Sequence, residues 1–230
     1  MSPSESFRQA LTAAAPVMLG YVVIGLPCGI LSAAAGLNVA QVAMLALLYY
    51  SGAGQFMIPN MWMAGVPVAS IVASISLVNT RQVLYSVSLA RFAENSGRAL
   101  TYLFAATVTD ETFGVNNQRF TGGDWSVGRA TVTNLLCQSA WSTACVVGVL
   151  IGSALHVPLS IASFAMTSIF ICLLFMQKMS RDNILAAVAA AIGVVICKLV
   201  GLSGPAVVIG ALAGVGVGAA AMLARDVRHP

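Results

Sequence analysis

Residues 9–80 read QALTAAAPVMLGYVVIGLPCGILSAAAGLNVAQVAMLALLYYSGAGQFMIPNMWMAGVPVASIVASISLVNT and contain no Asp, Glu, Lys or Arg. As an α-helix rising about 1.5 Å per residue, this stretch would be roughly 108 Å long, over three times the ~30 Å hydrocarbon core of a bilayer. The chain must therefore cross a membrane repeatedly. The stretch ends at Arg81, whose charge still lies in apolar sequence, and a charge inside a membrane is costly unless it is paired or lines a polar cavity. Arg81 is for this reason the first candidate functional residue.

The composition of the whole chain agrees with a membrane-embedded protein. Hydrophobic residues make up 59% of it and charged residues 8%, whereas a soluble domain has about 25% charged residues. The net charge of +4 comes from basic residues scattered singly, without interleaved aromatic residues, so it indicates membrane orientation and not a nucleic-acid surface. The five cysteines all fall in apolar segments without a CxxC motif, so we expect no disulfide framework, no metal site and no cofactor.

Apolar runs between polar breaks predict an all-α, polytopic integral membrane protein with about eight transmembrane helices, some of them broken. They form a single transmembrane transporter domain over residues 1–230, surrounded by membrane lipid. The predicted spans are residues 10–35, 39–58, 66–90, 99–117, 130–155, 159–177, 183–200 and 204–224. A seven-span alternative bends the third segment into a re-entrant hairpin at residues 79–81.

The distribution of Lys and Arg predicts the orientation of these spans, because basic residues collect on the cytoplasmic side. With both termini inside, eight spans place seven basic residues in the cytoplasm, namely Arg8, Arg119, Arg129, Lys178, Arg181, Arg225 and Arg228. Three basic residues, Arg91, Arg98 and Lys198, are then outside. Seven basic residues inside against three outside favour this orientation, although the loop that contains Arg91 and Arg98 would then be a basic loop on the outer side.

Two GxxxG patterns, Gly25 with Gly29 and Gly148 with Gly152, recur 123 residues apart. They are compatible with an internal repeat, which transporters often have, or with close helix packing in a glycine-rich chain. Gly210, Gly214 and Gly218 extend the pattern into the last span. Glycine faces in the first and last spans that are not needed for internal packing could seat another helix bundle.

The second predicted span contains Ser51, Gly52, Gly54 and Gln55, followed by Pro59. This composition weakens a helix and frees backbone groups, and the N–H ends of broken helices bind anionic substrate groups in several transporter folds. Tight packing against a neighbouring helix is the alternative explanation of the glycines.

Polar residues also occur in the third and fourth spans. Asn79 and Gln82, with Tyr85 one turn later, share a helical face around Arg81, and the guanidinium could clamp a carboxylate with two hydrogen bonds or form a structural ion pair. Asp110 and Glu111 are adjacent acids in the fourth span, so we expect one of them to hold a proton near neutrality, as a proton-coupled carrier requires. The alternative is an interfacial pair that reaches cytoplasmic water.

One polar face is predicted in the fifth span. Asn134, Gln138 and Ser142 follow i, i+4, i+8 spacing, so they lie on the same side of a helix. Such a face lines a cavity or joins helices by hydrogen bonds.

The order of these motifs resembles the AzlC family, the large subunit of branched-chain amino-acid exporters. The resemblance rests on Gly20 with Tyr21, Gly25 and Gly29, then on the SGAGQF stretch from Ser51, Asn79-x-Arg81 with Leu84 and Tyr85, and Thr109-Asp110-Glu111. Gln82 stands where this family typically has His.

The resemblance implies a secondary carrier that exports branched-chain and related amino acids from the bacterial cell across its inner membrane, together with a small membrane subunit of the AzlD type. We expect Ser51, Gly52, Gly54, Gln55, Asn79, Arg81 and Tyr85 to bind an aliphatic amino acid, and Asp110 and Glu111 to couple its export to protons in an antiporter. An accessory membrane subunit without its own substrate site is the alternative function. An enzyme is not expected, because the chain has only two histidines and no GxSG motif.

Overall fold

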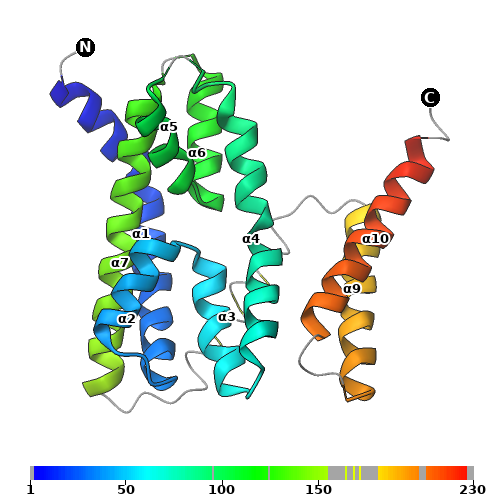
Figure 1. Ribbon diagram of the computed structural model, residues 1–230. Helices are drawn as coiled ribbons and strands as arrows, with labels where there is room; N and C mark the ends of the chain where they lie inside the picture. The colour runs from blue at the N-terminus through cyan, green and yellow to red at the C-terminus, as the bar shows by residue number, and fades with distance from the viewer. Residues whose placement is uncertain are drawn as a thin grey trace. The chain divides into compact units, whose positions relative to one another are not determined.

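The computed structural model describes residues 3–94, 96–123, 125–154, 181–201 and 206–226, with the single residues 164, 168 and 171. All of the secondary structure in these residues is helical, as predicted (Figure 1). The helices are α1 (Pro3–Ala34), α2 (Val39–Met44), the π-helix η1 (Leu45–Tyr49), α3 (Gly52–Met63), α4 (Val68–Ala90), α5 (Arg98–Ala106), α6 (Asp110–Thr121), α7 (Val127–Ala154), α9 (Arg181–Leu199) and α10 (Ala206–Asp226).

The helices group into two compact units. The first comprises Met1–Asn60 and Val78–Met166, and the second comprises Met61–Leu77 and Thr167–Pro230. The predicted sixth span, residues 159–177, lies almost wholly outside the described residues, and the single transporter domain stays a prediction. All of the candidate site residues belong to the first unit.

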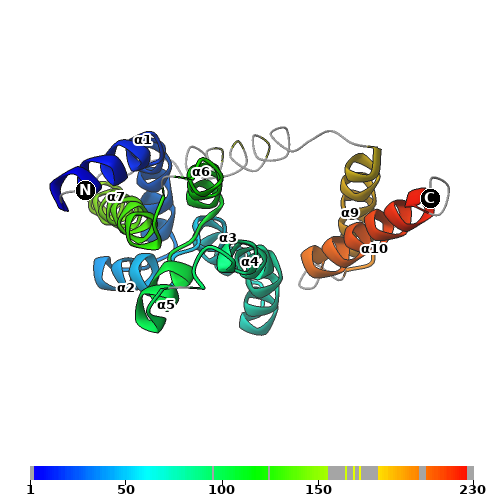
Figure 2. The same ribbon diagram turned by 90° about the horizontal axis from the view of Figure 1, so that it is seen from above.

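The first unit is built around α1 and α7, which lie side by side (Figures 1 and 2). In the described residues these are the two helices long and apolar enough to cross a membrane. They run parallel, since the Thr133 hydroxyl donates to the Ala10 carbonyl near one end and Gly152 faces Ile30 near the other. A Cβ atom added at Gly148 would lie 3.0 Å from the Cα of Gly29. The close packing predicted for the two GxxxG motifs is confirmed, because each motif lies against the other.

The second predicted span is broken. The α2 helix continues through η1, Tyr50 leaves the helical conformation with φ 16° and ψ 64°, and α3 begins at Gly52. The Gly54 N–H donates to the Ser51 hydroxyl at 3.3 Å, so Ser51 supplies an acceptor for the otherwise unpaired amides of this new helix start.

The fourth predicted span is broken as well, between α5 and α6, although its composition predicts no break. Thr109 forms a capping box with Thr112, and two acids follow in the first turn of α6. These features favour a helix start there, because a hydroxyl cap satisfies free amides and the helix dipole attracts carboxylates. Asp110 and Glu111 therefore begin a helix and do not lie in the second half of a continuous span.

Neither broken segment forms one crossing helix, and the predicted spans 39–58 and 99–117 need correction. Each folds back on itself at its break (Figure 1). We call them hairpin 1 (α2, η1 and α3) and hairpin 2 (α5 and α6). Their helices have 5 to 12 residues. At about 1.5 Å per residue, even the longest is roughly 18 Å and too short for the ~30 Å hydrocarbon core.

The α4 helix between the hairpins is continuous over its 23 residues. It passes through residues 79–81 without a break, so the alternative with a re-entrant hairpin at that place is wrong.

Basic residues gather at one end of the first unit. That end joins the start of α1, the end of α4, the start of α5, the end of α6 and the start of α7 (Figure 1). The Arg129 guanidinium donates to Gln9 at 2.7 Å, and Arg119 and Arg129 both lie over the Trp125 ring. The prediction that Arg91 and Arg98 lie opposite Arg8 is therefore wrong, because the chain between them and α7 turns back instead of crossing.

The described part of the second unit contains the close pair α9 and α10. Gly193 faces Gly210, and a Cβ atom at Gly214 would lie 2.8 Å from the Ala186 carbonyl oxygen. The GxxxG glycines of α1 and α10 thus serve packing inside their own units. They do not form the free surface for a partner that the sequence analysis considered.

Candidate functional site

The tips of the two hairpins meet beside the middle of α7. Asn134 donates to the Thr107 hydroxyl at the tip of hairpin 2, and Gln138 donates to the Leu47 carbonyl near the tip of hairpin 1. One turn further along α7, the Trp141 ring lies 3.5 Å from where a Cβ atom of Gly52 would be. Asn134 and Trp141 are seven positions apart, about 10 Å along the helix axis. Two helix starts, those of α3 and α6, therefore come together inside the unit.

The polar face of α4 contacts the tip of hairpin 1. The Ser51 hydroxyl donates to the Asn79 side-chain oxygen at 2.7 Å, and the Asn79 nitrogen donates to the Tyr49 hydroxyl at 2.6 Å. Gln82 donates to the Tyr50 carbonyl at 3.4 Å. Asn79 and Gln82 thus share one face, as predicted, and that face anchors the break. Tyr85 turns toward hairpin 2 instead, where its ring stacks on Phe113.

The remaining predicted residues of hairpin 1 pack against the protein. Gln55 is 3% exposed, accepts a hydrogen bond from the Trp141 indole at 3.0 Å and donates to the Leu45 carbonyl. Gly54 lies so close to the Tyr49 ring that a Cβ atom there would be 2.7 Å from a ring carbon. The predicted break at Ser51 is confirmed and the glycines also pack tightly, whereas binding of an anionic group by the freed amides stays a prediction.

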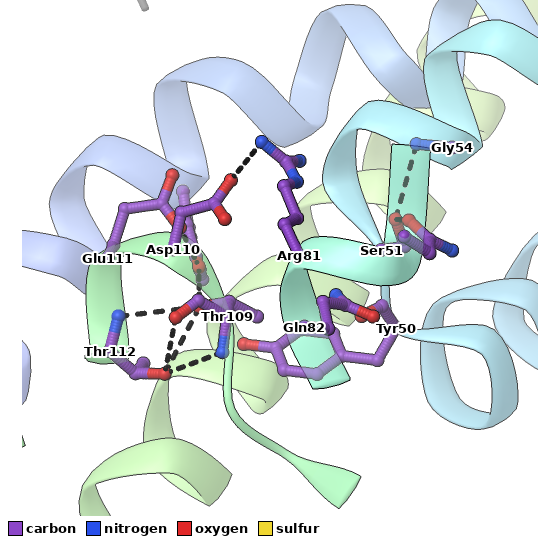
Figure 3. A network of polar contacts seen from close by, with 11 residues as sticks. Tyr50, Ser51, Gly54, Arg81, Gln82, Thr109, Asp110, Glu111 and Thr112 are labelled. Atoms are coloured by element: carbon purple, nitrogen blue, oxygen red, sulfur yellow. Dashed lines mark hydrogen bonds and ion pairs between the residues drawn. The ribbon is translucent and has the colours of Figure 1, made fainter. Parts of the chain in front are cut away.

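The tip of hairpin 2 brings the two acids to different partners (Figure 3). Asp110 forms an ion pair with Arg81, with 2.7 Å between Nη1 and Oδ2. Glu111 accepts a hydrogen bond of 2.6 Å from the hydroxyl of Tyr21 on α1. The same hydroxyl lies 2.6 Å from the Thr109 hydroxyl, so α1 contacts this helix start as well.

Several polar atoms at the ion pair have no hydrogen-bond partner in the described structure. Arg81 Nε and Asp110 Oδ1 are buried and have no hydrogen-bond partner in the described structure, and neither does the hydroxyl of Tyr50, a residue that is 5% exposed. The Arg81 and Asp110 side chains are themselves only partly buried, at 30% and 22% exposure. A donor and an acceptor of opposite charge therefore remain at this place, which suits a small zwitterion.

The polar face predicted on α7 is present and holds the hairpins. Asn134 is fully buried, accepts a hydrogen bond from Asn116 at 2.8 Å and donates to the Phe104 carbonyl at 3.4 Å. The carbonyl at the end of α5 thereby gains a partner that the broken helix cannot supply. The described hydrogen bonds of Asn134 and Gln138 agree with the interpretation of this face as one that joins helices.

Sequence reasoning missed three tyrosines, of which Tyr49 and Tyr50 lie at the tip of hairpin 1 and Tyr21, on α1, contacts the tip of hairpin 2. The sequence marks Tyr21 only through the family resemblance, and it marks neither Tyr49 nor Tyr50. No local pattern marks them, because their partners lie 30 or more residues away in the chain. Within the described residues, no group of three His, Cys, Asp or Glu side chains is arranged to hold a metal ion.

Comparison with known proteins gives one family. The AzlC protein family matches residues 16–155, which include both hairpins and α7. An uncharacterized membrane protein of Helicobacter pylori (strain J99) is 32% identical over 189 residues, covering 78% of each chain. The inner membrane protein YgaZ of Escherichia coli is 26% identical over 159 residues, covering 66% of this chain and 63% of its own. The Bacillus subtilis branched-chain amino acid transport protein AzlC is 21% identical over 211 residues, covering 90% and 81%. No solved structure matches.

Proposed function

Because this chain belongs to the AzlC family, we propose that it is a secondary carrier that exports branched-chain and related hydrophobic amino acids. The proposal places it in the bacterial inner membrane as a multi-pass protein that works with protons and a small AzlD-type subunit. The Bacillus subtilis relative named as a branched-chain amino acid transport protein supports this substrate class.

The observation that carries the proposal is the Arg81–Asp110 ion pair between two helix starts. The substrate carboxylate would bind the Arg81 guanidinium, which offers a planar fork of donors, and the free amides at the start of α3, where Ser51 and Gly52 lie and the Gly54 N–H is already bonded to Ser51. Asn79 and Gln55 would hold that helix start in place through their hydrogen bonds to the protein. Tyr85, stacked on Phe113, would supply part of the apolar wall for an aliphatic side chain.

The two acids would have different roles, one in binding the substrate ammonium and one in proton coupling. Asp110 would receive the substrate ammonium at its unpartnered Oδ1 atom, in competition with Arg81. Glu111 would carry the coupling proton, because it contacts the neutral Tyr21 hydroxyl, which can donate or accept a hydrogen bond, whereas Asp110 is paired with Arg81. A proton released to the cytoplasm from this position would drive substrate outward.

The test is efflux of branched-chain amino acids from cells loaded with dipeptides. Arg81→Lys keeps the charge but loses the planar fork, so export should fall by about tenfold or more while the amount of protein in the membrane stays normal. Arg91→Lys is the matched control, since Arg91 lies over the Phe92 ring in the turn after α4. Normal export by Arg81→Lys would leave Arg81 with a structural role only.

A further inference from the structure

The two hairpins share one spacing along the chain. The α3 helix runs from Gly52 to Met63 and α6 from Asp110 to Thr121, so both have 12 residues and both start and end 58 positions apart. Each helix follows a hydroxyl residue, Ser51 or Thr109, that accepts the N–H of the residue three positions further on. The breaks are therefore equivalent in position and in chemistry.

Burial follows the same spacing. Leu31 and Leu89, on α1 and α4, are both fully buried, and 58 positions separate them. The pairs Ala46 with Phe104 and Tyr50 with Val108 keep this offset, and all four residues are at most 5% exposed. The residues themselves differ, so the repetition is one of structure more than of sequence.

The two copies have opposite directions. The α1 helix starts at the arginine-rich end of the first unit and leads into hairpin 1, whereas α4 ends there and leads into hairpin 2 (Figure 1). A helix followed by a hairpin thus occurs twice with inverted orientation. Inverted repeats give carriers two related conformations that face opposite sides of the membrane.

A crossed pair of hydrogen bonds joins the two copies. Tyr21 of the first copy contacts the cap hydroxyl of Thr109 in the second at 2.6 Å. Asn79 of the second copy accepts a hydrogen bond of 2.7 Å from the cap hydroxyl of Ser51 in the first. Tyr21 and Asn79 are again 58 positions apart. Each hairpin tip is therefore held by the long helix of the other copy.

We propose that residues 10–63 and 68–121 are inverted repeats, and that Tyr21 and Asn79 are equivalent positioning residues that hold two gates closed. Hairpin 2 is the gate at the arginine-rich end, which the positive-inside rule places in the cytoplasm, and hairpin 1 is the gate on the opposite side. Loss of one crossed hydrogen bond frees one hairpin and leaves the other in place. The assignment of gates rests on the proposed carrier function, whereas the two holding contacts do not.

Hydrogen–deuterium exchange of the purified full chain in lipid nanodiscs tests this proposal without any substrate. Tyr21→Phe should speed exchange in residues 98–121 by about three- to tenfold, the effect of losing one buried hydrogen bond, with hairpin 1 unchanged. Asn79→Leu should give the reverse pattern, with faster exchange in residues 39–63 only. Tyr102→Phe is the matched control, because Tyr102 lies in hairpin 2 but is 75% exposed, and it should change neither hairpin.

Two further variants separate the contact at Thr109 from other effects of Tyr21, which also binds Glu111. Thr109→Val should free hairpin 2 as Tyr21→Phe does, and Thr109→Ser, which keeps the hydroxyl, should restore the original exchange. Protection of α7 in every variant checks that the protein is folded. Acceleration of both hairpins by each variant, or of neither, would overturn the two gates even if amino-acid export is normal. Failure of the wild-type chain to export amino acids together with its small subunit would instead overturn the carrier function, and the exchange result would still test the two holding contacts.

Discussion

Replacing Gly148 with alanine should destabilise the protein by forcing α1 and α7 apart. The added Cβ atom would overlap the Leu26 carbonyl oxygen and lie 3.0 Å from the Cα of Gly29. Both atoms belong to the backbone of α1, so no side-chain rotation can relieve the contact.

The size of the effect follows from these distances. Ordinary contacts of a Cβ atom begin at about 3.4 Å, so the helices must separate by several tenths of an ångström or more. A gap of 0.5–1 Å forfeits about a quarter to a half of the dispersion energy of each affected contact, and overpacking of this kind typically costs about 1–3 kcal/mol. For a chain of this size, that corresponds to a fall in Tm of roughly 2 to 12 °C.

Thermal unfolding of the detergent-purified protein, followed by tryptophan fluorescence, measures this difference. Gly20→Ala is the matched control on α1, because a Cβ atom at Gly20 meets no atom within 4 Å, and it should leave Tm unchanged or slightly raised. Equal melting temperatures for the Gly148→Ala and Gly20→Ala proteins would refute the close packing of α1 and α7.

Three other outcomes are expected. Glu111→Gln should abolish export driven by a proton gradient, while exchange of internal for external substrate partly survives. Asp110→Asn should impair both processes, because it also removes the charged partner of Arg81. Gradient-driven export by the Glu111→Gln protein would show that another residue carries the proton. Asn134→Leu should lower stability by about 1–3 kcal/mol, because it leaves buried partners such as Asn116 unpaired. Thermal unfolding measures this loss, and an unchanged melting temperature would contradict the hydrogen bonds assigned to Asn134. A small hydrophobic subunit should copurify from native membranes, and full transport by this chain alone in pure lipid would remove that subunit from the proposal and would also exclude a purely accessory role.

Much of the fold could be read from local composition. A run of 72 residues without charge predicts helices, because only helices satisfy their own backbone in lipid, and the glycine pairs predict where two helices touch. The weak helix composition around Ser51 predicted the first break, and the isolated charge of Arg81 marked the candidate site. These features depend on a few neighbouring residues, which is why the sequence alone contains them.

Tertiary structure alone decided the path of the chain and the pairing of the polar groups. The fourth segment is apolar from Leu100 to Val108 whether it crosses the membrane or turns back at Thr109, so hydropathy could not distinguish the two paths. Arg81 and Asp110 are 29 positions apart, and their contact depends on the turn in hairpin 2. The proposed inverted repeat, with its offset of 58 positions, could not be read from the sequence for a related reason: its two copies preserve burial and hydrogen-bonding positions, which packing imposes, while the side chains that occupy those positions differ.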